Sequence, residues 1–216
     1  MTIIIDGTTQ PEDALDPHRH DPTTTPKVTI RPANWSAPPA AAFVLGDGGP
    51  GSVSGAVTLR GLSVAGFGDP TAGAIGGGVA AVQLWPSLTI EAGCAFQNNL
   101  PAAVSVVGAE GAPAGAVVIQ HATISQPPAS AGTGVSVGAA FSGSLLLSSV
   151  SVTGGSAGVR VQSADARVRL TNVTVRSPAG IGLDMAAAGT AIVGGAVSGC
   201  GGAAGIQLGP AAAGAP

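Results

Sequence analysis

The stretch Val57-Thr-Leu-Arg-Gly-Leu-Ser-Val64 alternates apolar and polar residues, and a two-residue bend at Arg60-Gly61 interrupts the alternation. The pattern returns at 117–124, 145–152 and 168–175, with a longer version at 88–96 and a weaker one at 190–197. Its starting points follow one another at intervals of 31, 29, 28, 23 and 22 residues. A recurrence of this length is typical of a solenoid, in which each repeat forms one turn.

Each copy shifts the phase of its apolar positions at the bend. The first, third, sixth and eighth residues are apolar, and one straight strand could not keep all four on the same face. We therefore predict two short strands that meet at a corner. The second bend residue is Gly61, His121, Ser149 or Asn172, and of these types Gly, His and Asn tolerate positive φ best. A third strand is predicted after each pair, at 103–106, 134–137, 158–161, 180–183 and 205–208.

The predicted fold class is therefore all-β: a right-handed parallel β-helix solenoid with three short strands per coil and about seven to eight coils. The chain has 216 residues, of which 45% are apolar, and its 35 Gly and 17 Pro residues punctuate β-branched runs. We expect a single domain over 1–209, with irregular first coils and loop insertions over 1–54 and regular coils over 55–209. Residues 210–216 are expected to form a flexible tail.

Charge and hydropathy argue against several classes of protein. The 8 Lys and Arg residues are outnumbered by 11 Asp and Glu residues, which disfavours nucleic acid as a partner. No segment is long and apolar enough to span a membrane, no signal peptide is evident, and no cofactor is expected. Cys94 and Cys200 lie about four coils apart, beyond disulfide reach at ~4.8 Å per coil, so we expect two buried free thiols.

The opening Ile3-Ile-Ile-Asp-Gly-Thr-Thr-Gln-Pro11 and the later Leu59-Arg-Gly-Leu-Ser-Val64 resemble phrases of bacterial right-handed parallel β-helix repeat proteins, the pectate-lyase-like superfold. The resemblance covers most of the chain and implies its architecture; an extracellular or cell-surface location is suspected. A capping segment usually precedes the opening phrase in that family, and it is missing here. Either the chain is a piece of a longer one, or a partner or another copy covers the open first coil.

Enzymes of that family act mostly on acidic polysaccharides. A lyase needs carboxylates that hold Ca²⁺ and a basic residue that removes a proton, whereas a hydrolase needs paired carboxyl groups across the scissile bond. No catalytic pattern of the family matches a position of this chain, and we assign no catalytic residue. The carboxylates of the repeat region are scattered, one per coil or fewer: Asp47, Asp69, Glu91, Glu110, Asp165 and Asp184.

Basic residues form the best candidate for a ligand site. Four of the seven arginines fall within 17 residues, and strand alternation turns Arg160 and Arg169 outward. Asp184 lies one coil later on the third-strand face, near Arg160. With Trp85 as a sugar-stacking platform, these residues form the predicted ligand-binding set, because Arg contacts carboxylates in a bidentate manner. The competing interpretation is a solvated surface with one local Arg–Asp pair, and a cap on the coil edge for Trp85.

Metal binding is not predicted. His18, His20 and Asp21 are residue types that bind transition metals, and they lie close together in a Pro-rich segment. The pattern offers no third preorganised ligand, so these three residues are weak candidates only. His121 stands at a bend and is interpreted as a turn residue rather than a base.

Three functions stay open. The favoured one is a non-catalytic β-helix scaffold or adhesion module of a surface, secreted or phage-like appendage assembly, which contacts glycan or protein partners through an extended face. The first alternative is a polysaccharide lyase or glycoside hydrolase whose catalytic residues are unusual or lie elsewhere. The second alternative is a solenoid that stacks end to end. Charged residues are too few and too scattered to favour the enzyme.

Overall fold

The computed structural model describes residues 2–6, 28–31, 41–45, 56–68, 77–81, 87–108, 115–127, 132–202 and 204–209. Within these residues the protein is all-β and contains no helix. Its strands are β1 (Thr2–Asp6), β2 (Val28–Ile30), β3 (Ala41–Leu45), β4 (Ala56–Arg60), β5 (Leu62–Ala65), β6 (Gly77–Ala81), β7 (Ser87–Ile90), β8 (Ala95–Gln97), β9 (Ala102–Val106), β10 (Ala116–Gln120), β11 (Thr123–Ser125), β12 (Thr133–Val137), β13 (Ser144–Ser148), β14 (Ser151–Thr153), β15 (Ala157–Val161), β16 (Arg167–Arg176), β17 (Leu183–Met185), β18 (Gly189–Ser198) and β19 (Ile206–Leu208).

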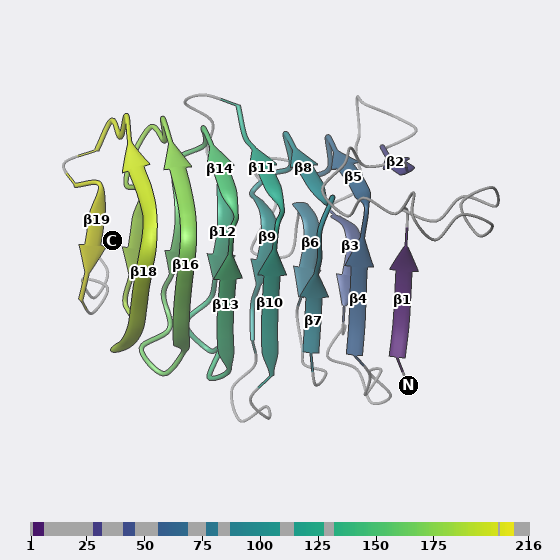
Figure 1. Ribbon diagram of the computed structural model, residues 1–216, viewed down its shortest axis with the longest axis horizontal. Helices are drawn as coiled ribbons and strands as arrows, with labels where there is room; N and C mark the ends of the chain where they lie inside the picture. The colour runs from purple at the N-terminus through teal and green to yellow at the C-terminus, as the bar shows by residue number, and fades with distance from the viewer. Residues whose placement is uncertain are drawn as a thin grey trace.

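The strands form two parallel sheets. In the larger sheet, two rows of strands, β1-β4-β7-β10-β13 and β2-β5-β8-β11-β14, both lead to β16, and β18 pairs with β16. The smaller, seven-stranded sheet runs β3-β6-β9-β12-β15-β17-β19. The strands stand side by side along the long axis of the molecule, from β1 near the N-terminus to β18 and β19 near the C-terminus (Figure 1). Parallel sheets with a crossover after every third strand are compatible with a parallel β-helix.

The predicted bends are confirmed. Gly61, His121, Ser149 and Asn172 have φ angles of 60°, 49°, 53° and 52°. This left-handed region is uncommon for residues other than glycine. The bend position therefore imposes the conformation even on Ser149, whose residue type has no preference for it. Because of this bend, apolar residues on both sides of it face the core.

Apolar residues stack in ladders, by which we mean residues at one register position in successive strands. One such ladder is buried from Leu59 on β4 to Leu170 on β16, and in β18 the exposed fraction of Ile192 rises to 37%. A ladder of this kind buries each side chain between its two neighbours, so the core depends on contacts between repeats. The members of this ladder before Ile192 are Leu59, Ile90, Ile119, Leu147 and Leu170.

A row of glycines lies where the smaller sheet approaches the larger one. Gly134, Gly158, Gly182 and Gly205 share one register position. A Cβ atom on Gly158 would lie 2.4 Å from Cγ1 of Val175 and 2.6 Å from the carbonyl oxygen of Gly182. Nonbonded carbon atoms prefer about 3.5–4.0 Å, so the close approach of the two sheets requires a residue without a side chain.

The third strand predicted at 180–183 lies further along, because β17 begins at Leu183. The sequence offers glycine at both 180 and 182, and the structure uses Gly182 in the glycine row. This register buries Leu183 and Met185 and places Asp184 opposite Arg160. The predicted register placed Asp184 opposite Gln162 and thus beside Arg160, whereas the observed register places it directly opposite Arg160.

Two further expectations need correction. The segments 167–176 and 189–198 each run through the bend as one strand, β16 and β18, rather than as two. Cys94 is a buried free thiol as expected, but the free thiol of Cys200 is only half-buried. Most of the expected irregular region 1–54 and the whole tail 210–216 lie outside the described residues.

Candidate functional site

Strand β16 carries three exposed arginines on the outer face of the larger sheet. Arg167 and Arg169 precede the bend at Asn172, and Arg176 ends the strand. The residues that alternate with them are buried, so the strand places the three charged side chains toward solvent while its other face fills the core. We call Arg167, Arg169 and Arg176 the β16 arginine row.

No acidic residue lies opposite the β16 arginine row in the described strands that pair with β16. Asp165 lies two residues before Arg167, but among the described residues none of the three guanidinium groups forms an ion pair. The row is therefore a line of positive charge without local compensation. Its cross-strand neighbours are Ser144 and Gly189 beside Arg167, Leu146 and Ala191 beside Arg169, and Thr153 and Ser198 beside Arg176.

Arg160 belongs to a different surface. It lies on β15 in the smaller sheet, directly opposite Asp184 of β17. Its Nε donates to Oδ2 of Asp184 over 3.3 Å, and both side chains are partly buried. The structure thus brings Arg160 and Asp184 together, as their sequence positions suggested, but places Arg169 on the other sheet. The predicted ligand-binding set is not one cluster.

The other described pair of opposite charges, Arg60 and Glu91, also joins neighbouring strands of one sheet. Nε of Arg60 on β4 donates to Oε2 of Glu91 over 2.9 Å, and Glu91 directly follows β7. Both pairs link neighbouring strands and occupy the guanidinium groups of Arg60 and Arg160. The β16 arginine row differs from them because its charge is available to a ligand.

A buried pair of amides forms a network that the sequence did not reveal. Asn99, fully buried, accepts from the backbone N–H of Phe67 (3.1 Å) and donates to the carbonyl oxygen of Val64 (2.9 Å). Gln126 donates to the carbonyl oxygens of Asn99 (2.7 Å) and Thr133 (3.1 Å). The only signal in the sequence was a polar residue within two positions after β8 and after β11. The network stabilises the fold rather than offering groups to a ligand, because its polar atoms are satisfied internally.

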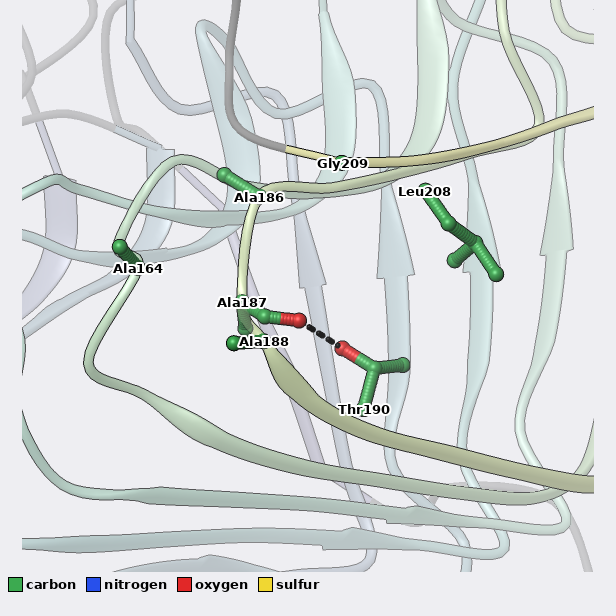
Figure 2. Close-up of a pocket in the computed structure, with 7 residues that line it drawn as sticks. All are labelled: Ala164, Ala186, Ala187, Ala188, Thr190, Leu208 and Gly209. Carbon is green, nitrogen blue, oxygen red and sulfur yellow. Dashed lines mark hydrogen bonds between the residues drawn. The ribbon is translucent and has the colours of Figure 1, made fainter.

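A hollow of about 420 Å³ lies at the C-terminal end of the sheets. The hydroxyl of Thr190 donates to the carbonyl oxygen of Ala187 over 2.8 Å, as Figure 2 shows. The described lining residues of the hollow include no acid, base or thiol, so these residues offer no group for general acid–base or nucleophilic catalysis. Its lining residues are Ala164, Ala186, Ala187, Ala188, Thr190, Leu208 and Gly209.

Within the described ranges, no groups are arranged for metal or carboxylate chemistry. No three His, Cys, Asp or Glu side chains there gather closely enough to hold a metal ion. Glu91 and Asp184 are each engaged by an arginine. His121 is the exposed turn residue that the sequence predicted. The candidates Trp85, His18, His20 and Asp21 lie outside the described residues.

No family model matches the chain, and no curated protein or solved structure matches it. Among the described residues, no helix is long and apolar enough to cross a membrane.

Proposed function

We propose that this chain is a non-catalytic, right-handed parallel β-helix module of the pectate-lyase-like kind, with three strand segments per coil, that binds an anionic polysaccharide across β16. It would serve as a scaffold or adhesion module of a surface or secreted assembly. The observation that carries the proposal is the β16 arginine row, which is exposed, lies on a rigid strand and has no acidic partner among the described residues.

The chemistry of the row favours a carboxylate- or sulfate-bearing polymer. A guanidinium group presents its N–H donors in a planar fork that matches the two oxygens of such an anion. Arg167 and Arg169 are two residues apart on one strand, which spaces their Cα atoms by roughly 6.6 Å. Thr153 and Ser198 flank Arg176 and add hydroxyl groups for sugar hydroxyls. A polymer that follows β16 therefore meets Arg167 and Arg169 before the bend at Asn172, and Arg176 with its flanking hydroxyl groups after it.

The enzyme alternative has no supporting arrangement of residues. Hydrolysis needs two carboxyl groups that flank one bond, and the described carboxylates lie apart, two of them bound to arginines. Lyase chemistry needs a basic residue close to carboxylates that hold a cation. The β16 arginine row has no such neighbours among the described residues, so binding without turnover is the function it favours.

Binding to immobilised polygalacturonate, a sulfated polysaccharide and neutral dextran tests the proposal. We expect retention on the two anionic polymers, loss of retention as salt rises, and none on dextran. Arg169→Gln and Arg176→Gln should each weaken binding about two- to fivefold, as expected for exposed charge contacts. Arg160→Gln is the matched control, because that guanidinium is already paired, and it should leave affinity unchanged.

Two results would count against the proposal. Equal binding to dextran, or equal losses in Arg160→Gln and Arg169→Gln, would show that the β16 arginine row does not select the ligand. Reducing ends are measured in the same samples, and polymer shortening would instead support the lyase or hydrolase.

A further inference from the structure

The C-terminal end of the sheets exposes side chains that belong to core ladders. Ile192 on β18 and Ile206 and Leu208 on β19 are exposed by 37%, 45% and 63%. Their ladder neighbours Leu170, Leu183 and Met185 in the preceding strands are almost completely buried. The three C-terminal residues are exposed because no described strand lies beyond them, not because they face outward. This end of the molecule is therefore an uncovered cross-section of the core.

Among the described residues, every large apolar side chain counted as exposed lies on an end strand. Four of them are on β18 and β19, and the fifth, Val44, lies on β3 at the opposite edge of the smaller sheet with 52% exposure. No charged residue and no proline interrupts β18 or β19. Natural edge strands usually carry such residues when they must stay unpaired.

The opposite end begins the same ladders that the C-terminal end finishes. Phe43 starts the ladder that ends at Ile206, and Leu45 starts the one that ends at Leu208. In the larger sheet, β1 stands at the first register position of the ladders that β18 ends. A strand sequence suited to follow β18 and β19 is thus present in the chain itself.

From these matching ends we infer that a second copy of this chain docks on the C-terminal end, with its β1 beside β18 and its β3 beside β19. Strand direction and register continue across the junction, and the second copy covers Ile192, Ile206 and Leu208. The hollow of about 420 Å³ adjoins Leu208 and lies at the same end, as the close-up of its lining shows (Figure 2).

The contact is heterologous, since one end meets the other end of the next copy. Such contacts propagate into filaments unless a rotation closes the ring. A symmetric contact between two C-terminal ends would instead pair the strands antiparallel and interrupt every ladder. The geometry therefore points to head-to-tail growth. This inference does not depend on glycan binding.

Mass measured by light scattering over a concentration series tests the inference with three full-length variants. Leu208→Glu places a charge at the C-terminal end and Leu45→Glu places one at the N-terminal end. Thr123→Glu is the control, because Thr123 is exposed on β11, which has a partner strand on each side and lies away from both ends. Circular dichroism verifies that each variant keeps its strand content, and Phe43→Glu, which changes the neighbouring core ladder of β3, replaces Leu45→Glu if the latter does not fold.

We expect the mass of the wild type and of Thr123→Glu to grow with concentration. Each end variant alone should stay at the chain mass of 20.4 kDa. An equimolar mixture of the two end variants keeps one intact pair of ends, so it should form a 1:1 dimer and nothing larger. A wild type that stays at the chain mass at every concentration would overturn the inference. Dimers of Leu45→Glu alone would overturn it as well, since they would show contact between like ends.

Discussion

Gly158 offers the sharpest test of how the two sheets pack. Its Cα lies in the glycine row, and a Cβ there would meet Cγ1 of Val175 at 2.4 Å, the carbonyl oxygen of Gly182 at 2.6 Å and Cγ2 of Val175 at 2.9 Å. Two of these atoms belong to a buried side chain and one to the backbone of the next strand. Gly158→Ala therefore forces the sheets apart or twists Val175 out of its rotamer.

The expected loss of stability follows from two opposing terms. Overpacking of a close-packed core costs about 1–3 kcal/mol. Replacing glycine by alanine also reduces the conformational entropy of the unfolded chain, which stabilises the folded state by about 0.4–1 kcal/mol. The free energy of unfolding should therefore fall by about 1–2 kcal/mol. With a urea dependence of about 2 kcal/mol per molar, the unfolding midpoint should drop by about 0.5–1 M.

Gly205→Ala is the matched control, since Gly205 holds the same register position directly before the last strand, β19. A Cβ there would lie 3.5 Å from Cγ1 of Val197 and 3.9 Å from Sγ of Cys200, which is ordinary contact. In Gly205→Ala only the lower conformational entropy of the unfolded chain remains, so the urea midpoint of this variant should equal or exceed that of the wild type. Both are measured by circular dichroism in urea.

A Gly158→Ala midpoint at or above the wild-type value would refute the packing argument. A further variant locates the cause. Val175→Ala removes both methyl groups that the new Cβ would meet, so the double variant should lose less stability than the sum of the two single changes. Strict additivity would mean that the clash with Val175 is not the source of the loss.

Other positions give independent tests. Asn99→Ala leaves the N–H of Phe67 and the carbonyl of Val64 without their buried partner, at a cost of about 1–3 kcal/mol for each group; urea midpoints should show this loss, and none for the exposed Gln97→Ala. Leu147→Ala should lower the free energy of unfolding by about 2–5 kcal/mol because Leu147 is fully buried, whereas Ile192→Ala should lower it clearly less. Equal losses in the two variants would contradict the description of the ladder. Burial raises the pKa of the Cys94 thiol, so the folded state resists ionisation. The contribution of the neutral Cys94 thiol to the free energy of unfolding is therefore fully present below the pKa of the unfolded state, about 8.5. It is lost as pH rises through the raised pKa of the folded state. Urea midpoints at pH 7 and pH 10 should diverge in the wild type and in Cys200→Ala but converge in Cys94→Ala; the chain has no tyrosine to mask the effect.

Burial could be predicted from the sequence because it follows from local periodicity. The phase shift within each repeat required a bend, and the bend at Asn172 has the positive φ that the residue type suggested. Alternation then identified which side chains face the core, including Cys94. The same reasoning failed at 180–183, where glycines at 180 and 182 allowed two registers. Only contacts between strands selected Gly182, because that register buries Met185 and sets Asp184 against Arg160.

Charge pairing could not be predicted in the same way, because a pair depends on which sheet each residue joins. Arg160 and Arg169 are nine positions apart and both face outward, yet a turn between β15 and β16 sends them to different sheets. Arg160 then meets an acid in the next strand, and Arg169 meets Leu146 and Ala191. The intervals between repeats decide this outcome: 24 residues separate Arg160 from Asp184 opposite it, whereas the residue opposite Arg169 in the next strand is Ala191, which carries no charge. An insertion that shifted the turn by one residue would reverse the facing of Arg169 and remove the β16 arginine row.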